Sequence, residues 1–451
     1  MKIKFCGGTG GVTGSNYLLE SEGAKILIDC GLYQGGSDVE RLNFEPFPYN
    51  PEEIDAIFLT HAHLDHIGRL PVLFKKGFQG RIISTPPTKD LGREILLDAG
   101  HLFSERAEKE RAPVLFDDKD IEKTMSAWET AKYREKITIK DVEVKFHDAG
   151  HILGSAFIVL TVDGEQVVFS GDLGNAPAPL VKDIEPLGEA DYLVMESTYG
   201  GRWHEDAKNR KNLLEDVIEN TALSGGTLMI PAFAMERTQA LLSEINDLVS
   251  AGRIPEMPVF VDSPLAINLT AVYKKYLGDP DYFDAETIKA SKEGKEFFNL
   301  AGLKFTPTTE ESKAINAVPA PKVIIAGSGM SQGGRIIHHE YRYLSDPKST
   351  ILFIGFQTTG SRGRRILEGV KEVEIFHESI PIRCRVESIT GYSAHADQAG
   401  LLKWIMLARR SLRRVFLVHG EENELKILEQ KVRDELAIET KIPILGEEVV
   451  L

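Results

Sequence analysis

Cysteine is scarce in this chain of 451 residues, and its scarcity excludes two kinds of protein. The three cysteines, Cys6, Cys30 and Cys384, are odd in number and show no CxxC spacing. A domain stapled by disulfides and a zinc site built from cysteine both require more thiols at closer spacing. We therefore expect three buried free thiols.

Long apolar runs are missing as well. The N-terminal stretch MKIKFCGGTGG lacks the apolar segment of a secretory signal, and nowhere do about 18 apolar residues run together as a membrane span requires. These absences predict a cytoplasmic protein without membrane contact. The formal net charge of −15 argues against non-specific binding of nucleic acid. Basic clusters at Ser361–Arg365 and Arg409–Arg414 leave two interpretations open, contact with a phosphate backbone or a solvated face.

The Gly-rich segment GGTGGVTGSN near the N-terminus resembles a phosphate-binding loop but lacks the residues that such a loop needs. The lysine of GxxxxGK[ST] is absent, and so is the third glycine of GxGxxG. The residues that follow, NYLLES, are typical of a strand rather than a helix. We predict a turn between strands.

Short apolar runs, many of them rich in β-branched residues, recur along the chain and end in polar residues, which is typical of buried strands. These runs are DAIFLTHAH, VVFSGD, DYLVMEST, TLMIPAF, VIIAGSG, ILFIGFQ and VFLVHGE. Helical periodicity between many of them, as over 206–224, 236–251 and 424–436, indicates an α/β protein. The segments SNYLLESEGAKILIDCG and SAFIVLTVDGEQVVFSGD predict antiparallel hairpins in the N-terminal part.

The segment THAHLDHIG concentrates metal-binding side chains directly after a strand. It contains His61, His63, Asp65 and His66 within six positions. Imidazole and carboxylate are the usual ligands of Zn²⁺ and Mn²⁺, and burying such a cluster without a cation leaves polar groups unpaired. Further candidates follow other strands: His151 in DAGHILGS, Asp172 in VVFSGDLGN and His419 in VFLVHGEE.

The combination of HxHxDH, a later Gly-His, a later Ser-Gly-Asp and a late Val-His-Gly resembles the metallo-β-lactamase fold family. Glu196 in YLVMESTYG, His395 in GYSAHAD and His419 are similar to motifs A, B and C of its β-CASP subgroup, which processes nucleic acids. The segments PAFAMERTQ, DSPLA, AGSGMSQGGRIIHH and GFQTTGSRGRRIL look like pieces of the β-CASP insert. The histidine at motif C is similar to the residue that RNA-processing members of the subgroup carry there. The chain as a whole resembles stand-alone bacterial and archaeal relatives of the endonuclease subunit of the mRNA 3′-end cleavage machinery.

The resemblance implies a site with two divalent metal ions, Zn²⁺ first and Mn²⁺ as the alternative. One ion would be held by His61, His63 and His151, the second by Asp65, His66 and His419, and Asp172 would bridge both. Asp29 in ILIDCG has the position of the family's aspartate that orients a ligand or the bridging water. Such ions can hold a hydroxide that attacks phosphorus, with the pKa of the bound water lowered to about 7.

The departing sugar oxygen then needs a proton, and His395 is the candidate general acid, held by Glu196 on its other ring nitrogen. For the phosphates beside the scissile bond, the segment GSGMSQGGR offers Ser328, Gly329 and Met330 in a turn before a helix, together with Arg335. Arg362 is a further candidate for the RNA backbone.

These features predict an αββα metallo-β-lactamase sandwich, residues 1–201 and 381–451, interrupted by an inserted α/β domain, residues 202–380, with the active site in the cleft between them. The leading function is that of a dinuclear zinc-dependent ribonuclease acting on single-stranded RNA, as an endonuclease, a 5′ exonuclease or both. The alternatives are a non-catalytic RNA-binding or scaffold subunit and a metallo-hydrolase of small molecules. A homodimer is expected from the resemblance alone.

Overall fold

The computed structural model describes residues 1–204, 207–355, 357 and 360–451. Glu205 and Asp206 at the expected domain boundary, and Phe356, Thr358 and Thr359 in the segment GFQTTG, lie outside the described residues. The chain divides into two compact units, residues 1–203 with 395–451 and residues 204–394. The sequence placed the return to the first unit at 381. Residues 385–388 instead form a strand of the second unit's sheet, so the return comes at 395.

The first unit is built on two seven-stranded sheets. The first sheet has the order β22 (Glu448–Val450), β1 (Lys2–Phe5), β2 (Tyr17–Glu20), β3 (Lys25–Ile28), β4 (Ala56–Phe58), β5 (Arg81–Ser84), β6 (Trp128–Thr130). The second has the order β21 (Glu439–Lys441), β20 (Arg414–Val418), β11 (Tyr192–Glu196), β10 (Glu165–Phe169), β9 (Ala156–Val162), β8 (Val142–Asp148), β7 (Ile137–Ile139). The predicted hairpins β2–β3 and β9–β10 are confirmed as antiparallel pairs.

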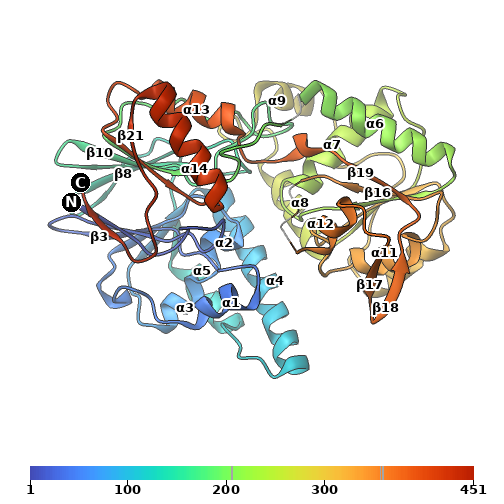
Figure 1. The fold of residues 1–451 in the computed structure, drawn as a ribbon, viewed down its shortest axis with the longest axis horizontal. Coiled ribbons are helices and arrows are strands. Elements are labelled where there is room, and N and C mark those ends of the chain that lie inside the picture. The colour runs from blue at the N-terminus through green and yellow to red at the C-terminus, as the bar shows by residue number, and fades with distance from the viewer. Residues whose placement is uncertain (205–206, 356, 358–359) are drawn as a thin grey trace. The chain divides into compact units, whose positions relative to one another are not determined.

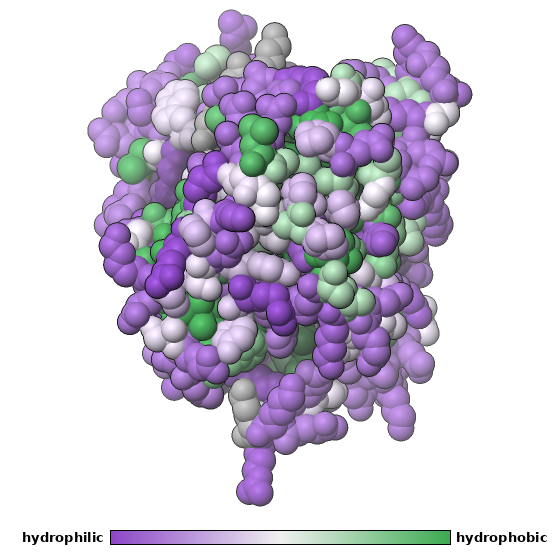
Figure 2. Space-filling model, turned by 90° about the vertical axis from the view of Figure 1, so that its right-hand side faces the viewer, coloured by the Kyte–Doolittle hydropathy of each residue, from purple (hydrophilic) through white to green (hydrophobic). Residues whose placement is uncertain are grey.

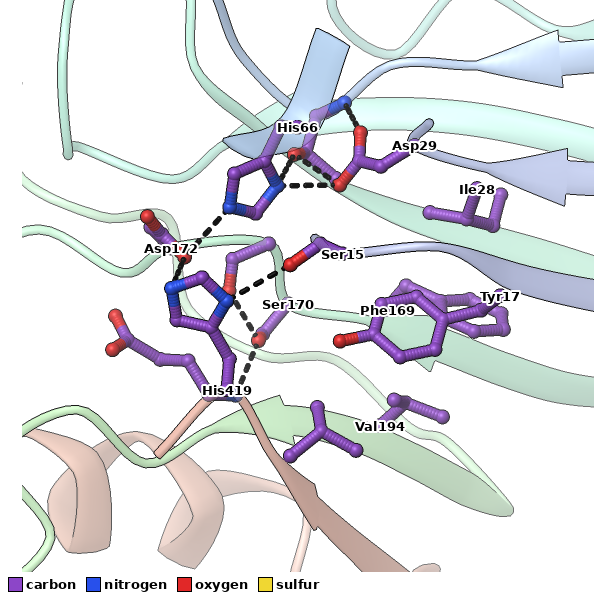
Figure 3. Close-up of a pocket in the computed structure, with 14 residues that line it drawn as sticks. Ser15, Tyr17, Ile28, Asp29, His66, Phe169, Ser170, Asp172, Val194 and His419 are labelled. Atoms are coloured by element: carbon purple, nitrogen blue, oxygen red, sulfur yellow. Dashed lines mark hydrogen bonds and ion pairs between the residues drawn. The ribbon is translucent and has the colours of Figure 1, made fainter. Parts of the chain in front are cut away.

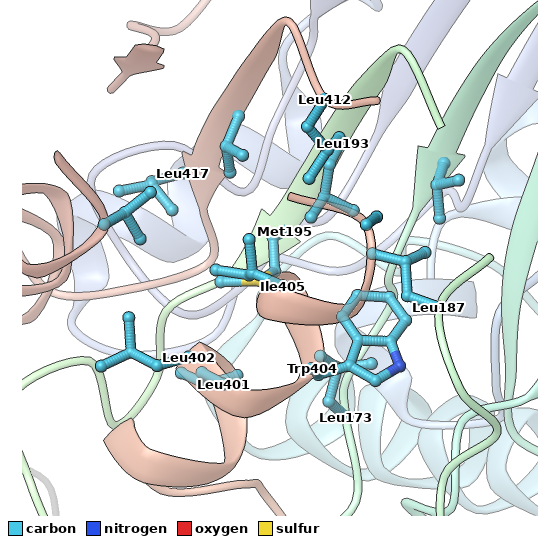
Figure 4. Close-up of a cluster of buried hydrophobic side chains, with 14 of the residues drawn as sticks. Leu173, Leu187, Leu193, Met195, Leu401, Leu402, Trp404, Ile405, Leu412 and Leu417 are labelled. Carbon is cyan, nitrogen blue, oxygen red and sulfur yellow. The ribbon is translucent and has the colours of Figure 1, made fainter. Parts of the chain in front are cut away.

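Helices cover the outer faces of both sheets, which gives the predicted αββα layers (Figure 1). The helices along the first sheet are α1 (Ser37–Glu40), α2 (Leu64–Ile67), α3 (Leu70–Lys75), α4 (Pro86–Glu110) and α5 (Asp118–Ala127). The second sheet is covered by α13 (Gln398–Leu407) and α14 (Glu422–Lys431). Its core packs Leu193 and Met195 of β11 and Leu417 of β20 against Ile405 and Trp404 of α13 (Figure 4). The apolar runs that the sequence predicted as buried strands therefore bury one face of the sheet under these helices.

The second unit is an α/β domain around a six-stranded parallel sheet. Its order is β14 (Leu303–Phe305), β13 (Val259–Asp262), β15 (Lys322–Ala326), β12 (Thr227–Pro231), β16 (Thr350–Phe353), β19 (Arg385–Ser388). A hairpin is formed by β17 (Glu372–Ile375) and β18 (Glu378–Pro381). The helices are α6 (Ala207–Leu223), α7 (Arg237–Ser250), α8 (Pro264–Tyr276), α9 (Ala285–Lys292), α10 (Thr309–Ala314), α11 (Ile336–Tyr343) and α12 (Arg362–Leu367).

The surface and the thiols agree with the composition. Cys6, Cys30 and Cys384 are buried free thiols, as the sequence predicted. The face drawn in Figure 2 is mostly hydrophilic, with apolar side chains in smaller patches. Among the described residues, no helix combines the length and the apolar character needed to cross a membrane.

Candidate metal centre

Side chains at the carboxyl ends of five strands and in two adjoining turns converge in the first unit. Strands β3 and β4 are parallel neighbours in the first sheet, as are β10, β11 and β20 in the second. Carboxyl ends of parallel strands meet at one edge of a sheet, so residues far apart in sequence come together there. The converging residues are Asp29 after β3, His61, His63, Asp65 and His66 after β4, His151 after β8, Asp172 after β10, Glu196 at the end of β11, His395 before α13 and His419 after β20.

One group of ligand atoms combines His61, His63 and His151 with Asp172. Their ligand atoms all lie within 4.8 Å of one another. His61 Nε2 is 3.3 Å from Asp172 Oδ2, and His151 Nε2 is 3.7 Å from the same oxygen. His63 presents Nδ1, which lies 2.9 Å from His61 Nε2. This group can enclose one cation with three nitrogens and one oxygen.

A second group combines Asp65, His66 and His419, again within 4.8 Å of one another. It faces the other oxygen of Asp172: His66 Nε2 lies 3.4 Å and His419 Nε2 lies 3.6 Å from Oδ1. Figure 3 shows both imidazoles turned toward the Asp172 carboxylate. The two oxygens of Asp172 thus face different groups, which is the arrangement that a bridging carboxylate requires.

The protonation states suit metal binding, because a ligating imidazole must be neutral and a ligating carboxylate ionised. Burial lowers the pKa of His61, and it lowers the pKa of His63 and of His151 well below the ordinary value. Burial alone would raise the pKa of Asp172, but His419, His66 and other imidazoles around it hold it well below its usual range. The first group therefore offers three lone pairs and an ionised oxygen at neutral pH.

The pKa of His66 shifts in the opposite direction, because carboxylates surround this imidazole and favour a positive charge there. Burial acts to lower its pKa, but the carboxylates of Asp172, Asp29 and Asp65 together raise it well above the ordinary value. In the part of the chain that the structure describes, neither His66 Nε2 nor Asp172 Oδ1 makes a hydrogen bond. Both atoms are buried, and a buried polar atom without a hydrogen bond costs a few kcal/mol. A divalent cation between them satisfies both, so the residues fit the metal that the sequence implied.

Asp29 lies beside the cluster and orients it. Its Oδ1 accepts the backbone N–H of Thr60 at 2.8 Å, and its Oδ2 accepts the Thr60 hydroxyl at 2.8 Å. The same Oδ2 lies 2.7 Å from His66 Nδ1. Because Nδ1 of His66 is turned to this carboxylate, Nε2 is turned to Asp65 and Asp172.

His395 and Glu196 form a pair at the rim of the first group. His395 Nδ1 lies 3.2 Å from Glu196 Oε2 and 4.0 Å from Asp172 Oδ2. The backbone N–H of Leu173 donates to Glu196 Oε1 at 2.6 Å, which holds the carboxylate in place. The side chain of His395 is 19% exposed, whereas the Glu196 side chain is fully buried. A partly exposed imidazole on a buried carboxylate suits a group that exchanges a proton with a bound substrate.

The predicted substrate-binding turn is present in the second unit, between β15 and α11. Ser328 Oγ accepts the backbone N–H groups of Gln332 and Gly333, both at 3.2 Å, which closes the turn containing Gly329 and Met330. Arg335 does not extend from it as a free cation. Its guanidinium donates to Asp262 Oδ1 at 2.8 Å and to the backbone oxygen of Thr306 at 2.5 Å.

Arg362 is similarly engaged within the protein. Its Nη1 donates to the backbone oxygen of Ser331 at 2.7 Å and lies 3.8 Å from Glu340 Oε2. The sequence predicted that Arg335 and Arg362 contact substrate phosphates. In the structure both guanidinium groups are bonded to protein acceptors and hold the turn in shape.

Sequence reasoning missed Thr60 and Ser15. Thr60 directly precedes the HxHxDH motif and links Asp29 to the cluster, so its position next to the motif was the available signal. Ser15 Oγ lies 2.8 Å from His419 Nδ1, although 404 positions separate the two residues. That contact depends on tertiary structure and leaves no local pattern.

Three family models match successive parts of the chain. The model of the metallo-β-lactamase superfamily matches residues 9–218, and that of the Beta-Casp domain matches residues 238–366. The model described as a Zn-dependent metallo-hydrolase RNA specificity domain matches residues 379–443. The fold and the His/Asp cluster thus define a metal-binding hydrolase.

Relatives extend the likeness over nearly the whole chain. It is 38% identical to Ribonuclease TTHA0252 of Thermus thermophilus, covering 95% of each chain. It is 31% identical to the RNase J-like protein of Methanocaldococcus jannaschii, covering 98% of each. It is 32% identical to the transcription termination factor FttA of Methanosarcina mazei, over 98% of this chain and 70% of that protein. The chain therefore belongs to the β-CASP family of the metallo-β-lactamase superfamily.

A solved structure shares the fold alone. A crystal structure of a protein of unknown function from Enterococcus faecalis superimposes with a TM-score of 0.57 at 14% identity. The match covers 100% of this chain and 99% of that one.

Proposed function

We propose that the protein is a ribonuclease that hydrolyses RNA phosphodiester bonds with the help of two divalent metal ions. The observation that carries the proposal is the pair of ligand groups facing the two oxygens of Asp172. The β-CASP and RNA-specificity matches, and two relatives named as a ribonuclease and as RNase J-like, support RNA as the substrate. The cytoplasmic location and the homodimer stay predictions from the sequence.

The metal ligands are proposed as two sets that share Asp172. His61, His63 and His151 hold one ion, and Asp65, His66 and His419 hold the other. The nitrogen-rich first set favours Zn²⁺, with Mn²⁺ as the alternative. When bound, such ions supply Lewis acidity to a phosphate oxygen and to the attacking water. Asp29, through His66 and Thr60, keeps the second set in its ligating orientation.

His395 is the proposed general acid. Hydrolysis forms a bond between a water oxygen and phosphorus and breaks the bond from phosphorus to a sugar oxygen, which must receive a proton. His395 Nδ1 lies 3.2 Å from Glu196 Oε2, and Nε2 is the nitrogen proposed to donate that proton. General-acid help of this kind contributes about 10²- to 10⁴-fold to the rate. Glu196, fixed by the Leu173 N–H, stabilises the protonated imidazole.

The turn at Ser328, Gly329 and Met330 is the proposed contact for a phosphate next to the scissile bond. The Ser328 hydroxyl accepts two backbone N–H groups and keeps its own hydrogen for donation. Arg335 and Arg362 act as positioning residues: Arg335 ties this turn to Asp262, and Arg362 donates to the Ser331 oxygen within it. Their loss would weaken RNA binding by loosening the turn.

Incubation of metal-loaded protein with end-labelled single-stranded RNA and DNA tests the proposal. Wild type should cleave the RNA, and Asp65→Ala should lose cleavage together with part of its bound metal. The sizes of the labelled products distinguish internal cleavage from removal of nucleotides at the 5′ end. Wild type at full metal content that is as inert as Asp65→Ala would refute the ribonuclease and favour a non-catalytic role.

A further inference from the structure

The Gly-rich segment near the N-terminus, residues 7–16, contacts two of the proposed metal ligands. The backbone N–H of His419 donates to the Gly8 oxygen at 2.7 Å, and Ser15 Oγ lies 2.8 Å from His419 Nδ1. The Ser15 N–H also donates to the backbone oxygen of Asp65 at 2.9 Å. Ser15, fully buried, therefore connects Asp65 and His419, which belong to the same ligand group.

We propose that Ser15 is a positioning residue that fixes the ring orientation and tautomer of His419 for the ion at Asp65, His66 and His419. The inference rests on the metal centre proposed above. His419 Nε2 faces Asp172 and Asp65, at 3.6 and 3.8 Å. A ligating Nε2 needs its lone pair, so the ring hydrogen must sit on Nδ1, where Ser15 Oγ accepts it.

Two of the neighbouring imidazoles, His61 and His66, have a comparable partner, which shows what Ser15 supplies to His419. His66 Nδ1 faces the Asp29 carboxylate at 2.7 Å, and His61 Nδ1 lies 3.0 Å from the Thr60 hydroxyl. Asp29 and Thr60 are hydrogen-bonded to each other, so one connected pair orients both rings. Figure 3 shows Ser15 pointing at His419 and Asp29 pointing at His66, both from the side away from Asp172. Loss of the Ser15 hydroxyl would leave the His61 and His66 contacts intact.

The backbone of His419 is held from other directions, so the hydroxyl of Ser15 controls the ring in particular. The His419 oxygen accepts the N–H of Ser197 at 3.2 Å and the hydroxyl of Thr198 at 3.3 Å. These bonds and the one to Gly8 fix the main chain of His419, which has a positive φ of 49°. Removing the Ser15 hydroxyl should therefore change the orientation of the imidazole without displacing the strand end.

Close packing explains two of the glycines in this segment, Gly8 and Gly14. Gly8 has a φ of 65°, and a Cβ there would lie 2.4 Å from the Tyr17 hydroxyl. Gly14 has a φ of 75°, and a Cβ there would lie 2.5 Å from the Tyr33 ring. Both positions combine a left-handed backbone with a contact that no side chain permits. The glycines let the segment fold tightly enough to bring Ser15 to His419.

Metal content and affinity test the inference independently of RNA cleavage. Apo protein is titrated with Zn²⁺ against a competing chelator, and the bound metal is counted by mass spectrometry. Wild type should bind two ions. Ser15→Ala should keep one ion at wild-type affinity and bind the other about 10- to 100-fold more weakly, the range typical for loss of a partner to a ligating histidine. Ser15→Thr, which retains the hydroxyl, should restore most of that affinity.

Thr13→Ala is the matched control, because Thr13 lies in the same segment and its hydroxyl donates to the Gln34 oxygen instead of a ligand. It should bind both ions like wild type. Wild-type affinity at both sites of Ser15→Ala, or an equal loss of affinity at both, would overturn the inference without contradicting the metal centre. Fewer than two ions on wild type would instead refute the metal centre. If Ser15→Ala does not fold, Ser15→Cys carries the same prediction, since a thiol is a weak acceptor.

Discussion

His395 Nδ1 lies 3.2 Å from Glu196 Oε2, although 199 positions separate the two residues in the sequence. The pair lies at the edge of the ligand cluster, with His395 Nδ1 4.0 Å from Asp172 Oδ2. His395→Ala should therefore retain two metal ions per chain and lose about 10²- to 10⁴-fold in the rate of RNA cleavage. Single-turnover cleavage at saturating protein checks the predicted rate, and the metal content of the same sample checks that both ions are retained.

His147 provides a matched control for that experiment. Its Nδ1 lies 3.1 Å from Glu185 Oε2, so it is also a histidine paired with a glutamate, but it is not a member of the ligand groups. His147→Ala should cleave RNA at the wild-type rate. Loss of metal from His395→Ala, with activity restored by added metal, would contradict the role of His395 as an acid.

Asp29→Asn should weaken binding of the ion at Asp65, His66 and His419 by about 10- to 100-fold. Asp29 accepts two hydrogen bonds from Thr60 and faces His66 Nδ1, and an asparagine amide can accept through only one of its two polar atoms. One donor is then left without an acceptor. A Zn²⁺ titration against a competing chelator measures the change, and wild-type affinity at both sites would show that the carboxylate is dispensable.

Glu236→Gln should remove a pH-dependent loss of stability in the second unit. Burial raises the pKa of Glu236 to about 7 from an ordinary value of 4.5, although Tyr273 donates a hydrogen bond to it. Between these two values the unfolded chain releases the proton first, so the free energy of unfolding falls as pH rises through this window and levels off above about 7. The loss is of order 3 kcal/mol, since one pKa unit corresponds to 1.36 kcal/mol.

Chemical denaturation of wild type and Glu236→Gln at pH 5 and pH 8 measures the effect. The stability advantage of the variant should be larger at pH 8 than at pH 5, because glutamine stays neutral at both. Glu256→Gln, at an exposed loop position of the same unit, should show the same stability difference from wild type at both values of pH. A Glu236→Gln advantage that does not change with pH would contradict the raised pKa.

The sequence predicted the strands and the convergence of the ligands because both leave local patterns. An apolar run that ends in a polar residue marks a strand end, and strand ends of parallel sheets meet at one edge. The predicted return at 381 differs from the division at 395, because β19 has no apolar run: RVES contains one apolar residue, Val386, and its pairing with β16 joins it to the second unit's sheet. Sheet pairing between distant segments is not encoded locally.

The contacts of Arg335 and Arg362 at the proposed substrate-binding turn also depend on residues that are distant in the sequence. The sequence suggested both as contacts for substrate phosphates, Arg335 from its place in a Gly-rich turn and Arg362 from a basic cluster further along the chain. Arg335 is instead bonded to Asp262, 73 positions earlier, and Arg362 to the backbone of Ser331, 31 positions earlier. Whether a guanidinium meets protein or substrate depends on acceptors that the tertiary fold supplies.

The most direct test of the account is the rate of RNA cleavage as metal is returned to metal-free protein. A 5′-end-labelled single-stranded RNA is incubated with apo wild type at zero, one and two equivalents of Zn²⁺ or Mn²⁺, beside Asp172→Ala. We predict that cleavage is absent without metal, that wild type reaches full activity at two equivalents, and that Asp172→Ala stays inactive at every ratio because both ligand groups lose their shared carboxylate. Cleavage by wild type in excess chelator, or by Asp172→Ala at the wild-type rate, would contradict the two-metal ribonuclease.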